Sequence, residues 1–167
     1  MNDFLKTIKG SEKIIDWFGY WIDFHDAEIH WIKFSRGGVL LQGNTFIDIG
    51  IVIGQNSKKH GHPSFVHFHF AHCASIDLSE FNQQNQLSNI QFALEDQLNA
   101  GKILPDGSTL IPQTAVIYTE NNQQYLAKQY LKVTFHPEFG VGGSFACYSA
   151  EVKNIQACDD YGNIVER

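Results

Sequence analysis

The stretch FVHFHFAH, residues 65–72, restricts the fold more than any other part of the sequence. In an extended chain its side chains alternate, so that Val66, Phe68 and Phe70 fall on one face and His67 and His69 on the other. A period of two residues is typical of a β-strand with one buried face and differs from the 3.6-residue period of an amphipathic helix. We therefore expect this stretch to form a strand that covers an apolar core.

The same alternation recurs along most of the chain, which predicts a mainly β protein. The predicted strands are 27–34, 39–53, 65–79, 90–94, 114–119, 125–136 and 144–155. The first two are separated by SRGG, a predicted hairpin turn in which Gly37 or Gly38 takes a positive φ. In the third, Ile76 and Leu78 continue the strand to about Ser79. Long strands joined by short polar turns indicate a sheet built from neighbouring hairpins.

Residues 11–21, SEKIIDWFGYW, are the one predicted helix. Ser11 is expected to be its N-cap, Ile14 and Phe18 share an apolar face, and Gly19 ends or weakens it. Strands and helices do not alternate, so a parallel sheet is not expected. The predicted fold is mainly β (α+β): an antiparallel sheet or sandwich of about eight strands, or a strongly curved sheet, with one N-terminal helix. The whole chain, 1–167, is predicted to be a single domain.

The composition narrows the classes of function. The formal net charge of −6 argues against a nucleic-acid-binding protein, which needs Lys and Arg to displace counterions. Cys73, Cys147 and Cys158 include no C-x-x-C pair, and the N-terminal sequence MNDFLKTIKG lacks the apolar segment of a signal peptide. No apolar run approaches the length of a membrane span. We therefore expect a cytoplasmic protein with free thiols and no nucleic-acid or membrane partner.

Histidine is the first candidate for chemistry, because two imidazoles on one strand face can bind one metal ion. His67 and His69 meet that condition, and a third ligand from His25, His30 or His136 would complete a zinc site with an open position. A chain with such a site would be a metal-dependent hydrolase. The alternative is that His67 and His69 line the half-polar face of a sheet, with no metal or other cofactor.

A second candidate is the polar cluster that follows the predicted helix. His25, Asp26, Glu28 and His30 fall within six positions. Asp26 and Glu28 can share a strand face as a carboxylate pair, which would favour an enzyme. The alternative is structural: we expect Asp26 to bond backbone amides at the helix-to-strand corner and His25 to bridge to a neighbouring strand. The nearby aromatic residues are predicted to join the helix to the sheet or to anchor a partner: they are Trp17, Tyr20, Trp21, Phe24 and Trp31.

The sequence FNQQN, residues 81–85, is the third candidate. Asn82 and Asn85 can accept positive φ and bond backbone groups, which is typical of residues that hold a turn. Amides are poor acids and bases, but they read polar partners through paired donors and acceptors. Both a turn-holding role and a role in partner contact remain open.

Three segments together resemble one family. DWFGYWIDFHDAEI, FNQQNQLSNIQF and VTFHPEFGVGGSFACYSAEV occur in this order over roughly residues 14–155. They are similar to the immunity-protein-50 family of bacterial polymorphic toxin systems, in which a W-x-x-F-H-D-A-E element, an F-N-x-Q-N turn and an FG-type turn follow one another. The matching residues are Trp21, Phe24, His25, Asp26, Ala27 and Glu28, then Phe81, Asn82, Gln84 and Asn85, then Phe139 and Gly140. Ile22 and Asp23 stand where the family pattern has a proline after the tryptophan.

The resemblance implies a small cytoplasmic protein that binds and neutralises a cognate protein toxin without catalysis or cofactor. An acidic inhibitor suits a basic toxin such as a nuclease, because opposite charges speed association. Two other classes remain open: the metal-dependent hydrolase described above, and a self-associating β domain in which exposed aromatic residues pair two copies into a homodimer.

Overall fold

The computed structural model describes residues 3–36, 45–54, 61–82, 84–97, 102–103, 105, 109–110, 115–121 and 123–165. The predicted hairpin turn at Gly37 and Gly38 and the first part of the predicted strand 39–53 lie outside the described residues, and so does Gln83 of the FNQQN turn. All elements named below lie within the described ranges.

Two helical segments and thirteen strands are present in these ranges. The helical segments are a short 3₁₀ helix, η1 (Asp3–Thr7), and α1 (Ser11–Phe18). The strands are β1 (Ile8–Lys9), β2 (Ala27–Arg36), β3 (Thr45–Ile53), β4 (Ser64–Ala71), β5 (Ala74–Ser79), β6 (Gln86–Asp96), β7 (Lys102–Ile103), β8 (Thr109–Leu110), β9 (Ile117–Glu120), β10 (Gln123–Leu126), β11 (Gln129–Pro137), β12 (Gly142–Cys147) and β13 (Ser149–Ala157).

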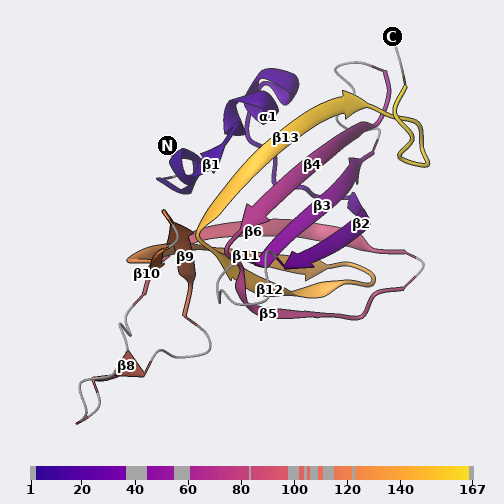
Figure 1. The fold of residues 1–167 in the computed structure, drawn as a ribbon. Coiled ribbons are helices and arrows are strands. Elements are labelled where there is room, and N and C mark those ends of the chain that lie inside the picture. The colour runs from indigo at the N-terminus through magenta and orange to yellow at the C-terminus, as the bar shows by residue number, and fades with distance from the viewer. Residues whose placement is uncertain are drawn as a thin grey trace.

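Nine strands form one sheet in the order β1-β13-β4-β3-β2-β6-β11-β12-β5, and β7–β8 and β9–β10 form two small hairpins. Neighbours in the large sheet are antiparallel except β1 and β13. Figure 1 shows that this sheet folds over, so that β13, β4, β3 and β2 cross β6, β11, β12 and β5 at a steep angle. A mainly β fold with one N-terminal α-helix is therefore confirmed. The large sheet is curved and mixed rather than wholly antiparallel, because β1 is parallel to β13, and it has nine described strands rather than about eight.

At one corner the sheet passes from one layer to the other through a bent two-stranded ribbon, in which β4 continues into β5 and β12 continues into β13. β4 pairs with β13 as far as Ala71 and Ser149, and beyond the bend β5 pairs with β12, starting from Ala74 and Ala146. The same two chain segments therefore contribute to both layers. Strands that bend from one layer into the other make the corners of orthogonally packed sheets.

This bend corrects two predicted strands. The predicted strand 65–79 is divided into β4 and β5, and the predicted strand 144–155 is divided into β12 and β13 at Tyr148. His72 and Ser75 have positive φ angles of 56° and 51° at the bend, although neither is a glycine. In 65–79 the apolar residues keep one phase through the break, so the sequence pattern does not reveal it. In 144–155 the buried positions change phase at Tyr148, from Phe145 and Cys147 to Ala150 and Val152.

The helix α1 starts and ends at glycines. Ser11 is not its N-cap as predicted: Gly10 occupies that position with φ 74°, and the hydroxyl of Ser11 donates to the carbonyl oxygen of Leu5 at 3.1 Å. Gly19 ends the helix as predicted, with φ 88° and its N–H bonded to the carbonyl oxygen of Ile15. Glycine is suited to both ends because it takes the left-handed conformation at little cost.

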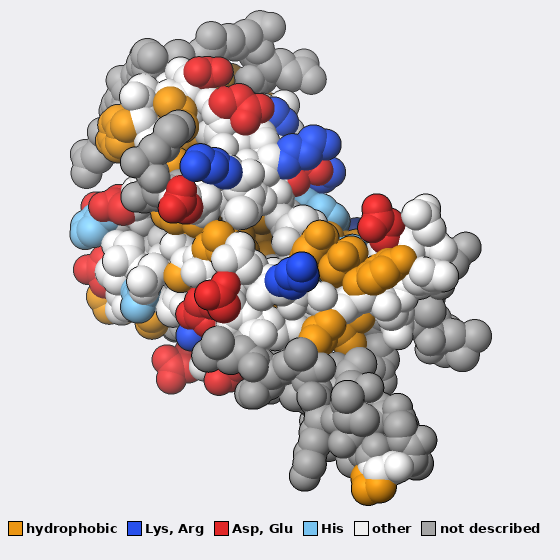
Figure 2. Space-filling model, turned by 90° about the vertical axis from the view of Figure 1, so that its left-hand side faces the viewer, with side chains coloured by type: hydrophobic (Ala, Val, Ile, Leu, Met, Phe, Trp, Pro, Cys, Tyr) orange, Lys and Arg blue, Asp and Glu red, His pale blue; other side chains and the backbone are white. Residues whose placement is uncertain are grey.

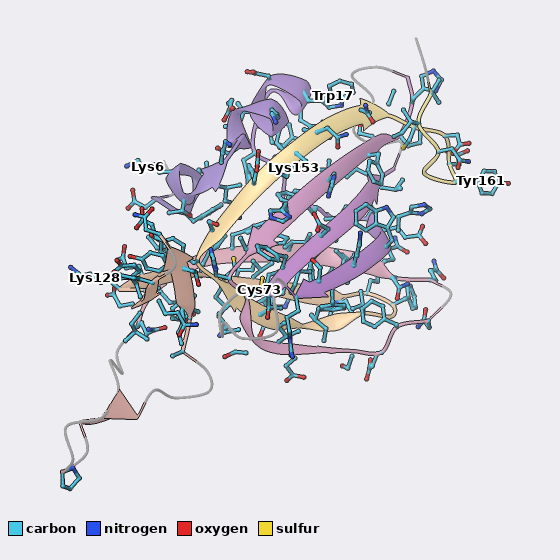
Figure 3. All side chains as sticks on the ribbon, in the orientation of Figure 1. Lys6, Trp17, Cys73, Lys128, Lys153 and Tyr161 are labelled. Carbon is cyan, nitrogen blue, oxygen red and sulfur yellow. The ribbon has the colours of Figure 1, made fainter. Side chains whose placement is uncertain are left out.

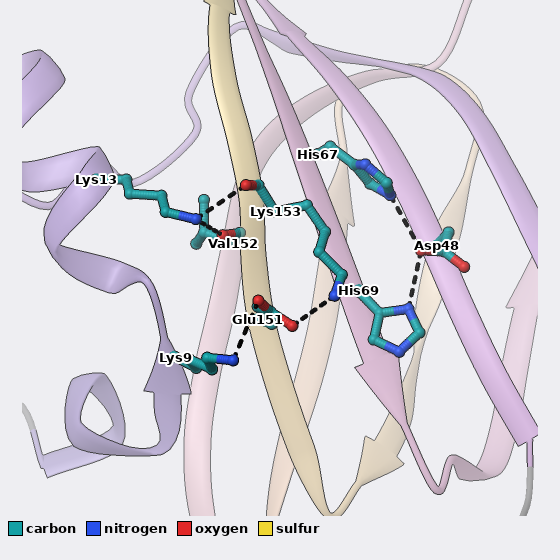
Figure 4. Close-up of polar contacts among 8 residues, drawn as sticks. All are labelled: Lys9, Lys13, Asp48, His67, His69, Glu151, Val152 and Lys153. Carbon is teal, nitrogen blue, oxygen red and sulfur yellow. Dashed lines mark hydrogen bonds and ion pairs between the residues drawn. The ribbon is translucent and has the colours of Figure 1, made fainter.

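The helix is fastened to the sheet at β13. The ammonium group of Lys13 donates to the carbonyl oxygens of Val152 and Lys153 at 2.8 and 2.9 Å, as Figure 4 shows. Ile14 is completely buried against the sheet. In the described residues no helix has the length and apolar composition needed to cross a lipid bilayer.

Aromatic side chains join the two layers in the core. Phe68 and Phe70 of β4 are fully buried, as the alternation in the sequence predicts. Their ring centroids lie 5.9 Å from Phe92 of β6 and 4.9 Å from Phe145 of β12, respectively. Each of these pairs connects one layer to the other, so the phenylalanines of β4 hold the folded-over sheet closed.

The three cysteines are free thiols in the interior, as expected. Cys73 lies at the bend between β4 and β5 (Figure 3), and burial raises its pKa to about 12. Burial also raises the pKa of Cys158 to about 11 and the pKa of Cys147 well above its ordinary value. Because the thiolate is the reactive form, none of these groups is suited to nucleophilic chemistry near neutral pH.

Candidate functional site

The three segments that carry the family resemblance lie far apart in the sequence but meet at one end of the molecule. Figure 1 shows the start of β2, the β5–β6 turn and the β11–β12 turn together at the right-hand end. The backbone N–H of Ile29 donates to the carbonyl oxygen of Asn85, and those of Glu138 and Phe139 both donate to that of Gln86, at 2.9 to 3.1 Å. We call this surface the motif end and define it as residues 24–28, 80–82, 84–86 and 138–141.

Asn85 is the centre of the motif end. Its Oδ1 accepts hydrogen bonds from the backbone N–H groups of Asn82 at 3.2 Å and Val141 at 3.3 Å, and its Nδ2 donates to the carbonyl oxygen of Asn82 at 3.0 Å. Oδ1 of Asn82 accepts from the N–H of Gln84 at 2.7 Å. Gly140 lies so close that a Cβ atom there would be 2.6 Å from Oδ1 of Asn85. Asn82 and Asn85 therefore hold the turn, which is the first of their two predicted roles.

His25 and Asp26 differ from their predicted roles. Oδ2 of Asp26 lies 3.0 Å from Nδ1 of His25, and Oδ1 of Asp26 accepts from Nε2 of Gln86 at 3.3 Å. Asp26, rather than His25, thus reaches the neighbouring strand, and the backbone N–H of His25 donates to Oδ1 of Asp23 at 3.1 Å. The His25 and Asp26 side chains are 61% and 44% exposed, so their contact contributes at most about 1 kcal/mol.

Phe24 anchors the motif end to the core. It is 1% exposed and has a φ of 63°, and Asp26 has a φ of 59°, so the chain reverses tightly where it enters β2. The Phe24 ring packs edge-on against Trp21 and Phe68 with centroids 6.0 and 5.6 Å apart. Trp21 and Phe24 therefore form the predicted aromatic joint, while Glu28 is exposed on the surface of β2.

The other aromatic residues near the helix have separate roles. Nε1 of Trp17 donates to the hydroxyl of Ser64 on β4 at 2.9 Å, which ties α1 to the sheet. Tyr20 is 64% exposed. Trp31 packs against Phe65 at 6.2 Å, away from the joint. Only part of the aromatic cluster in the sequence is thus a cluster in space.

His67 and His69 share the outer face of β4, as predicted, and both contact Asp48 of β3. Nε2 of His67 lies 3.0 Å and Nδ1 of His69 lies 2.9 Å from the same oxygen, Oδ1 of Asp48 (Figure 4). Trp31 packs edge-on against His67 at 5.2 Å, and Phe46 stacks on His69 at 5.6 Å. Sequence reasoning missed Asp48, although its polar position within the apolar run FIDIGIVI indicates an outward-facing side chain.

The electrostatics of this cluster stabilise the ionised carboxylate. Burial alone would raise the pKa of Asp48, but the hydrogen bonds and the charges of His69 and His67 outweigh burial and hold that pKa below its ordinary value. The three side chains are 20% to 27% exposed, so the contacts are partly shielded from water. Asp48 is therefore satisfied by two partners at once.

The structure does not assemble the alternative three-histidine metal site. His25 contacts Asp26, Nε2 of His136 lies 3.2 Å from Oε1 of Gln91, and His30 packs edge-on against Phe65 at 6.4 Å. Across the ranges that the structure describes, no group of three or more His, Cys, Asp or Glu side chains has the geometry to hold a metal ion. One ring nitrogen of His67 and one of His69 contact the carboxylate of Asp48. The two histidines therefore line the half-polar face of the sheet, which was the alternative to a metal site.

A tyrosine stack that the sequence did not reveal lies beside this cluster. Tyr118 of β9 is parallel to Tyr148, with ring centroids 4.0 Å apart, and Tyr125 of β10 stacks on Tyr118 at 5.3 Å. Figure 2 shows a group of hydrophobic side chains beside a histidine on the face from which this hairpin projects. The stack attaches β9 and β10 to the bent corner, so its role in the fold is to hold the hairpin in place.

The structure also has an open depression of about 360 Å³ beside the motif end. Trp21, Asp23 and Gln91 are among its lining residues, and Asp23 is the one titratable side chain in the lining. Among the described lining residues, Asp23 is thus the one side chain that could act as a general acid or base.

Comparisons of the chain with family models, with curated proteins and with solved structures gave no match. The resemblance to immunity proteins therefore depends on the three motif segments and on their residues. The structure adds a spatial relation that the segments do not show by themselves, since their backbone groups bond one another at one end of the fold.

Replacement of Asp48 tests the polar cluster. Asp48→Asn should lower the free energy of unfolding at neutral pH by about 1–3 kcal/mol, because bonds to a charged acceptor are lost. Folding lowers the pKa of Asp48, so the ionised carboxylate stabilises the folded protein above about pH 4. This stabilisation is lost as the pH falls through the pKa of Asp48 in the folded protein. Urea unfolding at neutral pH and at about pH 2.5 measures the free energy of unfolding of the variant and of the native protein, and the difference between the two should be smaller in acid. Exposed Asp77→Asn is the control, and an unchanged difference in acid would contradict this account.

Proposed function

We propose that this chain is a non-catalytic binding protein that occludes a protein toxin, and that it acts in the cytoplasm as the resemblance to immunity proteins implies. The observation that supports the proposal most strongly is the convergence of the three motif segments in one hydrogen-bonded unit around Asn85. A surface whose backbone is already fixed loses little conformational entropy when it binds. This arrangement suits recognition of a partner.

The chemistry of the motif end also favours binding over catalysis. The amides of Asn82 and Asn85 are neither acids nor bases, and they are bonded to the backbone of their own turn. His25 and Asp26 contact each other at an exposed corner, where water weakens their interaction. Exposed phenylalanines adjoin these groups, and aromatic side chains are enriched at the centres of protein interfaces.

Co-expression tests the proposal. The test first needs a probe: the C-terminal domain of a large secreted protein, sought among the genes that flank the gene for this chain. That domain should stop growth when it is produced in the bacterial cytoplasm, and co-expression of this chain should restore growth. Size-exclusion chromatography with light scattering should then show a stoichiometric complex. Failure to restore growth would contradict the proposal, and restoration without a complex would point to a catalytic mechanism instead.

A further inference from the structure

Two phenylalanines of the motif end are half-exposed beside hydrogen-bonded backbone groups. The Phe81 and Phe139 residues are 51% and 55% exposed. The N–H of Phe139 donates to the carbonyl oxygen of Gln86, and Phe81 directly precedes Asn82, whose N–H donates to Asn85. Exposed aromatic rings on a fixed backbone expose apolar area to water in the free protein, and such rings are the usual anchors of protein interfaces.

The Asp, Glu, Lys and Arg side chains of the motif end are all acidic, and His25 is its one imidazole. The motif end contains four carboxylates, all exposed: Asp26, Glu28, Glu80 and Glu138. None of the twelve Lys and Arg residues of the chain falls within its segments. Carboxylates of one sign clustered around apolar side chains create a negative potential that attracts a basic surface and repels an acidic one.

We propose that the motif end docks a basic protein surface, with Phe81 and Phe139 as apolar anchors and the four carboxylates facing Lys or Arg of the partner. This inference rests on the proposed function, because it names the partner chemistry of the same surface. The two kinds of residue act on different parts of binding. Buried aromatic anchors mainly slow dissociation, whereas exposed charges at the rim mainly speed association and make it depend on salt.

Binding measurements on matched variants test the inference. The probe is again the toxic C-terminal domain, and association and dissociation rates are measured at low and at high salt. Phe81→Ser combined with Phe139→Ser should weaken affinity by about 100-fold or more, since a hot-spot residue typically contributes a factor of ten or more. Phe34→Ser is the control, because Phe34 is 50% exposed at the other end of β2, about 20 Å from Glu28 along the strand.

A second pair of variants separates charge from apolar contact. Neutralising the carboxylates (Asp26→Asn, Glu28→Gln, Glu80→Gln and Glu138→Gln together) should slow association about 10-fold or more at low salt and remove most of its salt dependence. Glu12→Gln combined with Asp16→Asn, on the exposed face of α1, is the control and should change the association rate much less. Thermal melting of every variant checks that it is folded.

The possible results distinguish this inference from the proposed function. If the native chain binds but the double phenylalanine variant binds equally well, the docking surface is wrong and the proposed function stands. An association rate that does not depend on salt would contradict the proposal that the partner surface is basic. If the native chain does not bind the toxic domain, both proposals fail. A dimer of the chain alone that dissociates in the double variant would identify a second copy as the occupant and overturn the inference.

Discussion

Replacing Gly140 by alanine is expected to lower the free energy of unfolding by about 3 kcal/mol. Gly140 has a φ of 84°, a conformation that costs other residues energy, and a Cβ there would overlap the carbonyl oxygen of Gln84 and approach Oδ1 of Asn85. These atoms belong to the turn that Asn85 holds together, so they cannot move without breaking its hydrogen bonds. Urea unfolding followed by tryptophan fluorescence measures the loss.

Gly19→Ala is the matched control for this prediction. Gly19 has nearly the same φ, 88°, but a Cβ at that position would meet no atom within 4 Å. Its replacement should therefore cost about 1 kcal/mol, which is the cost of the left-handed conformation alone. Equal losses for the two variants would show that the close packing of Gly140 against the β5–β6 turn contributes nothing to stability.

Replacing Phe24 by alanine should be at least as costly, at about 3–5 kcal/mol. The ring is buried between Trp21 and Phe68, so its removal leaves a cavity between the motif end and the core. A loss of this size approaches the total stability of many domains, so Phe24→Leu is the companion variant and should cost about 1–2 kcal/mol. Phe81→Ala, in the half-exposed ring of the same surface, should change stability little. A similar loss in Phe81→Ala and Phe24→Ala would contradict the assignment of Phe24 to the core and Phe81 to the surface.

Local periodicity predicted those parts of the fold that depend on near neighbours in the chain. The alternation in FVHFHFAH placed Phe68 and Phe70 in the core and His67 and His69 on the outer face, because adjacent residues of a strand point to opposite sides. Gly19 ended the helix for a similarly local reason. These elements needed no knowledge of which strands pair.

The bends and the pairings were not predictable in the same way. His72 and Ser75 adopt positive φ where β4 passes into β5, and neither is a glycine or an asparagine, the residues that most strongly indicate such a conformation in a sequence. The contact of Asp48 with both histidines depends on β3 lying beside β4 in the observed register. The sequence instead suggested a third histidine, because a metal site is predicted from residue types. Such a site can be excluded only when it is known which strands pair.

The candidate site was predicted as separate pieces. The resemblance identified the segments around Asp26, Asn85 and Gly140, and turn chemistry predicted that Asn82 and Asn85 hold a turn. The sequence did not show that β2 and β6 pair near Glu28 and Gln86, which is the pairing that brings the segments together. The sequence also offered no reason to distinguish buried Phe24 from exposed Phe81 and Phe139, because the exposure of a side chain depends on how the layers pack.

Amide hydrogen exchange of the chain, alone and with the toxic domain used as the probe, shows whether the motif end is the surface that binds. Binding through the motif end predicts slower exchange in residues 80–86 and 138–141 and at the start of β2, with the outer face around His67 and His69 unchanged. Protection confined to the outer face or to the β9–β10 hairpin, with the motif end exchanging as in the chain alone, would contradict it.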